Sequence, residues 1–419
     1  MTDPHVIIDS ATPDDCDAIV ALIESTLGAA EAPSVRAWFR NTIHLPDRWM
    51  VVRNASDASD ASDSRSTIVA VAACLPAPMR FGSRSLAASR IEFVATRPGH
   101  RGLGHATELV TRLLAASDRR GDLVQIADGI PYYYRSLGFG YAVDPPTVVD
   151  LTGSLPAIDP APIAMNGTGP TVVRTAKADD SAALDRLIEE SSNSFDVVAE
   201  PRPWGVWFEA AAAADAHDFL LIAEQGLIIV GFARAHLDHN NIMRVQSSFS
   251  TSPEAARVLH ERLRSIGRGA VLALDSGSPV WRRHLGEHGD ATALPFGICL
   301  RIADHEAFLK SIRSELDTRL AVTRTAVPDQ VVRLSMFTSS VFIEIADGKV
   351  ADIRSAASIS DPVASGDVGI APDWFPALAF GRWGATVLGQ RVDDVILGDH
   401  AELLEILFPP LFVDSLVDL

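Results

Sequence analysis

The feature that most constrains the fold of this chain is an internal repeat. The segment 11–15 (ATPDD) precedes apolar residues at helical spacing, and a similar segment, 176–180 (AKADD), precedes the same spacing 165 residues later. A second echo has a shift of 148 residues, by which 129–131 (GIP) returns as 277–279 (GSP). Two echoes of this kind predict two copies of one domain rather than a single large fold.

The length of 419 residues leaves room for a third domain, since a domain takes roughly 150 residues. Glycine and proline are frequent in 153–170, as is typical of a connector. The pattern changes again after residue 300, where 341–348 (VFIEIADG) has the signature of a strand and a turn. We therefore predict a mixed α/β protein with domains over 1–150, 151–302 and 303–419.

The charge of the chain restricts its partners. It has 36 basic and 54 acidic residues, a net charge of −18, which argues against binding to a phosphate backbone and favours a cationic partner. The three cysteines, Cys16, Cys74 and Cys299, lie too far apart in the sequence for a disulfide framework or a zinc ribbon. We expect no nucleic-acid partner.

The sequence shows no targeting or membrane signal. Residues 1–4 (MTDP) carry no basic start and no apolar run follows them. The most apolar stretches, 67–79 and 219–235, fall short of the roughly 20 apolar residues that a membrane span needs. We therefore expect a cytoplasmic protein without a membrane partner.

A strand, a glycine-rich turn and a helix follow one another in the first copy. The segment 90–96 (RIEFVAT) has the pattern of a strand, and 100–106 (HRGLGHA) opens an amphipathic helix. Because Gly102 and Gly104 have no Cβ, successive backbone N–H groups can approach a pyrophosphate at the helix N-terminus. A strand, a glycine turn and a helix in this order are also common in α/β folds that bind no anion there.

A tyrosine-rich segment follows the next strand, 123–127 (LVQIA). It reads GIPYYYRSLGF over 129–139, and it contains three of the four tyrosines of the chain, Tyr132, Tyr133 and Tyr134, with Tyr141 just beyond. Together with the glycine turn, it resembles the GNAT superfamily of acetyl-CoA-dependent acetyltransferases. Those enzymes carry an Arg/Gln-x-x-Gly-x-Gly/Ala pyrophosphate loop and a downstream Tyr-x-x-x-Gly-Phe helix, whose tyrosine faces the CoA sulfur.

Tyr134, with Gly138 and Phe139, matches the family's tyrosine motif. The pyrophosphate motif fits in two registers: counted from Val94 its first position falls on Gly99, and a register that starts at Arg101 fits the strand spacing less well. Backbone amides bind the pyrophosphate in either register.

The whole layout is similar to the Eis-type (enhanced intracellular survival) acetyltransferases of this superfamily, over nearly the full length. The resemblance implies an active N-terminal GNAT domain, a degenerate central GNAT domain and a C-terminal sterol-carrier-protein-like domain. It also implies acetyl-CoA as co-substrate, no metal, and a homo-oligomer, a hexamer built from trimers.

The resemblance also implies roles for individual residues. Tyr134 would protonate the departing thiolate, and the backbone N–H of Val94 would hold the thioester carbonyl. The terminal carboxylate of Leu419 would be the base, with Asp418 beside it. Because an α-carboxylate with a pKa of about 3.5 is a poor match for an ammonium with a pKa of about 10, we expect it to orient the amine and relay its proton through water. Trp38 would contact the substrate unless it packs in the core. The contacts to acetyl-CoA would come from Phe93, Val94, Ala95, His100, Arg101, Gly102, Leu103, Gly104, His105, Gly129 and Ile130.

The second copy keeps some glycines of the repeat, such as Gly277 and Gly286, and loses the residues that match the family's motifs. Under the shift of 148, Gly102 and Gly104 become Ser250 and Ser252, and Tyr134 becomes Arg282. The segment 284–288 (HLGEH) matches a metalloprotease spacing, but Gly286 is the glycine of the repeat and a zinc site needs a third ligand. We predict no metal site there.

These observations predict an N-acetyltransferase that transfers the acetyl group of acetyl-CoA to primary amines of a cationic small molecule, similar to an aminoglycoside or a polyamine. Two alternatives remain open at this point. The acceptor is a protein lysine or N-terminus, or the chain is a non-catalytic protein that binds an apolar ligand on GNAT scaffolds. The intact set of Gly102, Gly104 and Tyr134 favours the enzyme.

Overall fold

The computed structural model describes residues 6–54, 67–145, 147–153, 169–200, 218–238, 240–294, 297–324, 326–337, 339–356 and 361–414. The chain forms two compact units. Unit 1 comprises Met1–Met79, Ser83–Val143 and Ile298–Pro410, and unit 2 comprises Arg80–Gly82, Asp144–Gly297 and Leu411–Leu419. Within the described ranges, every helix lacks the length or the apolar content that a bilayer-crossing segment requires.

The first sheet of unit 1 has seven strands, of which only β6 and β7 pair in parallel. In sheet order they are β1 (Val6–Ser10), β2 (Trp49–Asn54), β3 (Thr67–Pro76), β6 (Ala88–Thr96), β7 (Val124–Ala127), β17 (Ile298–Arg301) and β8 (Gly140–Val143). The short strands β4 (Met79–Phe81) and β5 (Arg84–Leu86) lie between β3 and β6 in the sequence.

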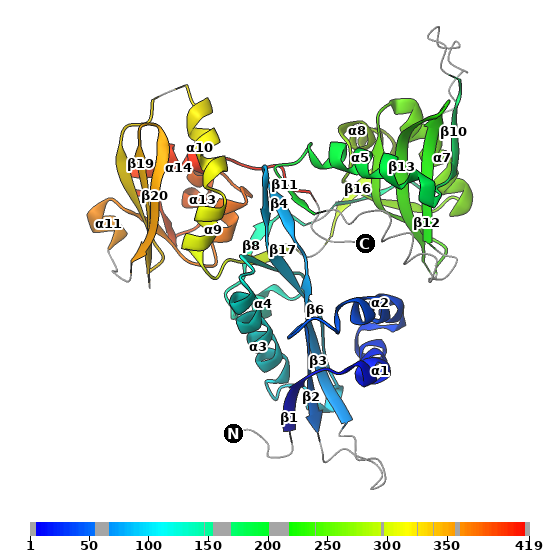
Figure 1. The fold of residues 1–419 in the computed structure, drawn as a ribbon, viewed down its shortest axis with the longest axis horizontal. Helices are drawn as coiled ribbons and strands as arrows, with labels where there is room; N and C mark the ends of the chain where they lie inside the picture. The colour runs from blue at the N-terminus through cyan, green and yellow to red at the C-terminus, as the bar shows by residue number, and fades with distance from the viewer. Residues whose placement is uncertain are drawn as a thin grey trace. The chain divides into compact units, whose positions relative to one another are not determined.

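Helices cover both faces of this sheet (Figure 1). On one face are α1 (Cys16–Leu27) and α2 (Ala32–Thr42), and on the other are α3 (His105–Arg120) and α4 (Pro131–Arg135). Alternate residues of the strands point to opposite faces, so β3 gives Val71 and Ala73 to the core beneath α1 and Ala70 and Ala72 to the core beneath α3. The sheet is therefore buried on both sides.

The sheet of unit 2 has the same strand order as the first sheet. Its strands are β10 (Thr171–Thr175), β12 (Asp218–Gln225), β13 (Ile228–Leu237), β14 (Met243–Ser250), β15 (Val271–Leu274), β9 (Thr147–Asp150) and β16 (Asp290–Ala293). Its helices α5 (Ser181–Ser192), α7 (Pro253–Ile266) and α8 (Pro279–His288) correspond to α1, α3 and α4. The strand β11 (Val197–Ala199) follows α5.

The shift of 165 residues relates the first elements of the two copies without a gap. Strand β1 and helix α1 map onto β10 and α5, and the 3-10 turn Pro13–Asp15 maps onto Ala178–Asp180. In both turns an aspartate accepts the backbone N–H three residues earlier and pairs with an arginine: Asp15 with Arg53, and Asp180 with Arg174. The repeat therefore conserves a helix start as well as an apolar pattern.

The sixth strand of each sheet comes from outside its own copy. In unit 1 this position holds β17, which follows the second copy in sequence, and in unit 2 it holds β9, which follows the first. Both strands pair antiparallel with their two neighbours. Strand 147–150 thus falls in the predicted domain 1–150 but belongs to the sheet of the second copy. Strand 298–301 falls in the predicted domain 151–302 but belongs to the sheet of the first copy.

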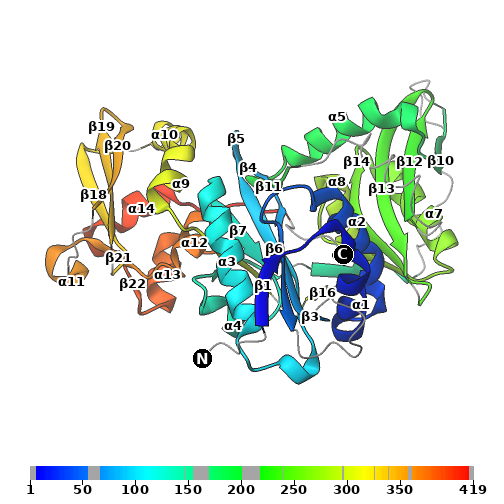
Figure 2. The same cartoon turned by 60° about the horizontal axis from the view of Figure 1, so that its bottom comes forward.

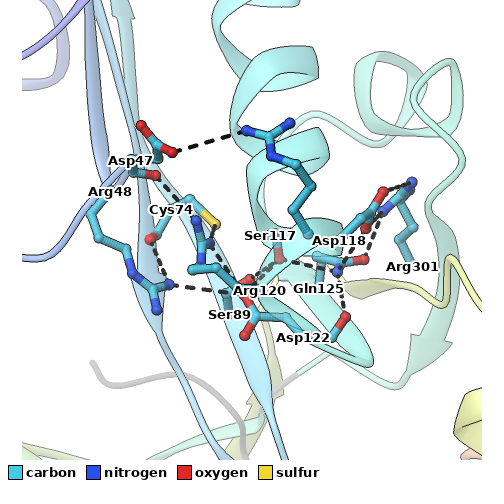
Figure 3. A network of polar contacts seen from close by, with 11 residues as sticks. Asp47, Arg48, Cys74, Ser89, Ser117, Asp118, Arg120, Asp122, Gln125 and Arg301 are labelled. Carbon is cyan, nitrogen blue, oxygen red and sulfur yellow. Dashed lines mark hydrogen bonds and ion pairs between the residues drawn. The ribbon is translucent and has the colours of Figure 1, made fainter.

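A polar network that runs from the surface into the core fixes β17 in the first sheet (Figure 3). Arg301 donates from both terminal nitrogens to the carboxylate of Asp118, at 2.8 and 2.9 Å, and also to Oε1 of Gln125, at 2.9 Å. Gln125 is fully buried and donates in turn to Ser117, which donates to Asp122 at 2.7 Å. Such fork-shaped pairing is specific as well as strong, so it selects β17 for this position.

The C-terminal part of unit 1 has its own five-stranded sheet (Figures 1 and 2). The strands in sheet order are β20 (Lys349–Ala356), β19 (Ser340–Ala346), β18 (Gln330–Ser335), β21 (Val368–Ile370) and β22 (Val395–Ile396). The helices are α9 (His305–Ser311), α10 (Arg313–Val322), α11 (Pro362–Ser365), α12 (Phe375–Ala379), α13 (Ala385–Arg391) and α14 (Ala401–Leu407).

This C-terminal part packs against β8 and α4 of the first sheet. A Cβ at Gly140 would overlap the backbone carbonyl of Asp373, so only glycine permits this approach. The carboxylate of Asp373 also pairs with Arg135 at 2.9 Å. The helix that carries Tyr134 is thereby braced at its last residue.

Candidate active site

The site is built where β6 and β7 separate. Their parallel pairing ends at Arg90 and Ile126, and the register of β6 against β3 shifts between Glu92 and Ala95. Phe93 has a φ of 55°, in the left-handed region, as expected of an extra residue in a strand. In the described registers neither Phe93 nor Val94 has a strand partner, so the bulge lies where β6 has moved out of register with β3 and no longer pairs with β7.

The glycine turn lies between β6 and α3. Gly102 and Gly104 have φ values of 80° and 82°, and a Cβ on either would meet only open space. Gly104 is the N-cap residue of α3, and no side chain caps the helix there. No side chain therefore occupies the N-terminus of α3, whose first N–H groups follow an exposed glycine turn. This geometry is typical of anion-binding sites.

The structure places the residues that were expected to bind acetyl-CoA along this strand and turn. Phe93 and Ala95 are buried on the α1 face, where Phe93 stacks on Trp49 with ring centroids 5.5 Å apart, so only their main chains can face a ligand. Leu103 and Ile130 are 65% and 69% exposed. His100, Arg101, Gly102 and Gly104 lie in the turn before α3, His105 is the first residue of that helix, and Gly129 lies in the turn before α4.

The turn coincides with one of the two possible motif registers. Gly99 lies inside the 3-10 turn Pro98–His100, whereas Arg101 immediately precedes the two glycines of positive φ. The Nε of Arg101 donates to the carbonyl of Thr96 at 3.2 Å, which ties the turn to the end of β6. The register that starts at Arg101 thus places its glycine, Gly104, at the helix cap.

Tyr134 lies on α4 and is 7% exposed. Its ring contacts Tyr133 and Phe139 edge-on, with centroids 5.1 and 5.5 Å away. Burial raises the pKa of Tyr134 above its ordinary value, and the nearby Tyr133, Asp128 and Glu92 raise it further. The phenol is therefore held in its protonated form at neutral pH.

Glu92 and Asp128 are site residues that sequence analysis missed. Burial raises the pKa of Glu92 from 4.5 to about 7, an effect that Arg90 partly offsets and Asp128 reinforces. The side chain of Glu92 nevertheless keeps 27% of its surface exposed, and its Oε1 lies 3.5 Å from a guanidinium nitrogen of Arg90. Only its place one residue before the β-bulge could have drawn attention to it, because the sequence does not report burial.

The expected substrate residues are divided by the structure. Trp38 is half-buried and packs on the core beneath α1 and α2, so the structure supports the core-packing alternative for it. Trp49 is fully buried and donates from its indole to Thr42 at 2.8 Å. Leu419 and Asp418 lie outside the described residues.

The second copy lacks the equivalent turn. Only two residues separate β14 from α7, whereas eight separate β6 from α3. Helix α7 is closed by Ser252, whose hydroxyl accepts the N–H of Ala255 at 3.2 Å, and Pro253 occupies its first position. Because a side chain and a proline fill the helix N-terminus, this copy has no open anion site at that place.

The histidines of 284–288 are used within the core of unit 2. His284 and the fully buried His260 share a hydrogen bond of 3.0 Å, and His260 bonds the carbonyl of Leu151 at 3.1 Å. Burial lowers the pKa of His284 to about 3. Across the described ranges, no three His, Cys, Asp or Glu side chains are grouped so that they could hold a metal ion.

Comparisons with known proteins agree with this geometry. Residues 8–142 match the family model of the acetyltransferase (GNAT) domain, and no curated protein matches the sequence. Among solved structures, a GCN5-related N-acetyltransferase from Kribbella flavida is 18% identical with a TM-score of 0.66, covering 99% of this chain and 98% of that one.

Two further solved structures have the same fold over the full length. A GCN5-related N-acetyltransferase from Anabaena variabilis is 11% identical, with a TM-score of 0.66 and 98% of each chain covered. Eis1 from Mycobacterium abscessus is 16% identical, with a TM-score of 0.58 and coverage of 98% of this chain and 97% of that one. At these identities the comparisons establish the fold.

Proposed function

We propose that the chain is an acyltransferase of the GNAT family, whose acetyltransferase domain model matches residues 8–142, and that it transfers the acetyl group of acetyl-CoA to a primary amine of a cationic small molecule. The observation that carries the proposal is the separation of β6 from β7 at a bulge that leads into an open glycine turn. This arrangement places a strand bulge next to a helix N-terminus whose geometry suits an anion.

The turn binds the pyrophosphate of acetyl-CoA. A Cβ added at Gly102 or Gly104 would meet nothing within 4 Å, so a phosphate can approach the backbone of this turn, and the helix dipole of α3 favours negative charge there. One strand back, the main-chain N–H of Val94 donates to the thioester carbonyl, whose oxygen gains negative charge as the amine attacks.

Glu92 is the general base. A base is most effective when its pKa lies near the working pH, and the pKa of about 7 meets this condition far better than an α-carboxylate near 3.5. Part of its side chain is open to an incoming amine or to a water that relays the proton. In this proposal Glu92 is the proton acceptor, because its pKa suits that role better than the pKa of the Leu419 carboxylate does.

Tyr134 is the general acid for the departing sulfur. Burial raises its pKa, which alone would make proton transfer to a thiolate more unfavourable. The same surroundings raise the pKa of Cys299, a thiol in the same core cluster, to about 11. Because a leaving thiol in this environment is also a stronger proton acceptor, the difference between donor and acceptor stays small.

The reaction balances with these two groups. The amine nitrogen forms a bond to the acetyl carbon as the C–S bond breaks, Glu92 takes the proton that the nitrogen loses, and Tyr134 gives one to the sulfur. The products are the acetylated amine and the CoA thiol. Solvent then removes the proton from Glu92 and returns one to Tyr134.

The charge near the reaction centre supports a cationic acceptor. Asp128 acts on the pKa of Glu92, Tyr134 and Cys299, so it lies near all three groups. Two carboxylates at the opening attract an ammonium group and disfavour an anionic acceptor. The net charge of −18 acts in the same direction.

The similarity to Eis-type enzymes supports several finer proposals. These are an Eis-like protein with the sterol-carrier-protein-like domain in 303–419, the degenerate GNAT domain in 151–302, cytoplasmic location and assembly into a hexamer. In the same proposal the carboxylate of Leu419 orients the amine beside Asp418. A tag fused after Leu419 tests that role, since full activity of the tagged protein would remove the carboxylate from the mechanism.

The proposed function is tested by release of the CoA thiol from acetyl-CoA. The protein is assayed with an aminoglycoside, a polyamine, a lysine peptide and no acceptor. We expect thiol release that depends on the small polycationic amines and exceeds that with the peptide. Faster reaction with the lysine peptide would reassign the acceptor to protein, and no release with any amine would overturn acetyl transfer.

A further inference from the structure

Arg282 occupies in the second copy the helical position that Tyr134 occupies in the first. Helix α4 begins with Pro131 and helix α8 with Pro279, and both residues stand at the fourth position of their helix. Arg282 is half-buried, and its Nε donates to Asp275 at 3.1 Å. The place of the catalytic phenol is thus taken by a fixed cation.

This cation lies over a side chain from the other end of the chain. The guanidinium carbon of Arg282 is 4.4 Å from the ring centroid of Phe412. Phe195, just before β11, stacks on the same ring with centroids 4.9 Å apart and planes inclined by 8°. Phe412 therefore makes a cation–π contact and an aromatic stack at once, all within unit 2.

The main chain around Phe412 is held as an added strand. The N–H groups of Asp196 and Val197 donate to the carbonyl of Phe412 at 2.8 and 3.3 Å, and the N–H of Asp414 donates to Val197 at 2.9 Å. Val197 and Val413 form a parallel bridge. The N–H of Phe412 donates to the carboxylate of Asp196 at 2.7 Å, so both the sequence position and the direction of the segment are specified.

We infer that the second copy has exchanged acyl transfer for peptide docking: its former tyrosine position, together with Phe195 and Asp196, holds the C-terminal segment Leu411–Asp414. Arg282 is a positioning residue, since it acts on the segment and not on a reacting atom. The ligand class is an extended peptide with one aromatic side chain that an arginine covers. In this protein the bound peptide is the chain's own segment Leu411–Asp414.

The inference also has a catalytic consequence, and that part rests on the proposed function. The residues after Asp414 include Asp418, which the resemblance assigns to the acceptor amine. A dock at 411–414 fixes where that acidic segment starts. Loss of the dock should therefore weaken binding of the cationic amine and leave binding of acetyl-CoA unchanged.

Amide hydrogen exchange in the full-length protein tests the dock directly. In Arg282→Ala we expect the amides of Val197, Phe412 and Asp414 to exchange about tenfold faster or more, because the segment opens without global unfolding. Arg283→Ala, which removes an exposed arginine next along α8, is the matched control and should leave them protected. Unchanged exchange in Arg282→Ala would overturn the dock.

Two further variants keep this test independent of folding. The amides of α7 report on the core of unit 2, and if they also exchange faster in Arg282→Ala, Phe412→Ala carries the test because it leaves that core intact. Arg282→Lys retains a cation and should restore part of the protection. Protection in Phe412→Ala equal to that in the unaltered protein would contradict the inference.

Steady-state kinetics test the catalytic consequence. Arg282→Ala and Phe412→Ala should raise KM for the amine by about fivefold or more with KM for acetyl-CoA unchanged, as expected for loss of acceptor binding alone. An unchanged amine KM would overturn this consequence. If the unaltered protein transfers no acetyl group, the proposed function fails, whereas the exchange result still decides whether the dock exists.

Discussion

Single residues set the chemistry of this site because of where they are buried. Tyr134 and Glu92 both have raised pKa values, and burial is the main cause for each. The consequences for the proposed mechanism differ: the phenol is kept protonated, as the proposed acid must be, and the pKa of the carboxylate is brought close to neutral pH, where the proposed base would work. Neither property belongs to the residue type, so the sequence alone identified only the tyrosine, through its motif.

Tyr134→Phe removes the proposed acid and should lower kcat at least tenfold, with little change in KM for acetyl-CoA, because the ring and its packing remain. Tyr132→Phe is the matched control, since Tyr132 lies on the same helix and is 90% exposed. Steady-state thiol release measures both variants. Equal kcat values in Tyr134→Phe and the control would remove Tyr134 from the mechanism.

Glu92→Gln should stabilise the protein at pH 8. A carboxyl group whose pKa is about 7 folded and 4.5 unfolded costs stability as pH rises between these values, by about 3 kcal/mol at most. The uncharged glutamine does not pay this penalty, so its advantage should be absent at pH 4 and full above pH 7.

Urea unfolding of Glu92→Gln across this pH range measures the effect. Glu108→Gln serves as control, because Glu108 is half-exposed in a surface pair with Arg112. A gain in the free energy of unfolding that does not depend on pH would contradict the raised pKa of Glu92.

At the scale of elements, helix α3 has a glycine at each end, so substitutions at its two ends can distinguish an effect on acetyl-CoA binding from an effect on stability. Gly104 at its N-cap and Gly121 at its C-cap share a φ of 82° and open surroundings. Alanine at either position should cost about 1 kcal/mol of stability from left-handed strain. Only Gly104→Ala should raise KM for acetyl-CoA, by about tenfold, because only that turn faces the pyrophosphate. An equal rise in Gly121→Ala would mean that stability, and not the turn, controls binding.

The sequence predicted those elements whose signals are local. The echo at 165 residues predicted α1 and its counterpart α5, because a cap and an apolar stripe define a helix without reference to its neighbours. The exchange of β9 and β17 could not be predicted, because four-residue apolar strands fit any sheet edge. Arg301 selects the first sheet through Asp118 and Gln125, a contact between residues far apart in sequence.

At the scale of the whole molecule, the exchanged strands make the predicted boundary at residue 150 a poor place to divide the chain. Residues 1–150 lack β17, which lies between β7 and β8, and retain β9 without its sheet. We expect this fragment to lose cooperative unfolding in calorimetry. Residues 1–302, which contain both exchanged strands, should regain it, and cooperative unfolding of 1–150 alone would contradict the role of β17.

The second copy makes long-range contacts with other parts of the chain. The second copy gives β17 to the first sheet, and it holds Leu411–Asp414 through Arg282 and Asp196. Its own helix N-terminus is capped and closed. A copy without a reaction site of its own can thus remain necessary for the protein.

The central claim, acetyl transfer with Glu92 as base, is tested most directly by the pH dependence of kcat/KM for acetyl-CoA at saturating amine. The account predicts that kcat/KM rises with pH through an apparent pKa near 7, separate from the rise near 10 that deprotonation of the amine causes. Glu92→Gln should lose the rise near pH 7 and should lower kcat/KM at least a hundredfold. A Glu92→Gln variant that keeps both this rise and its kcat/KM would contradict the account.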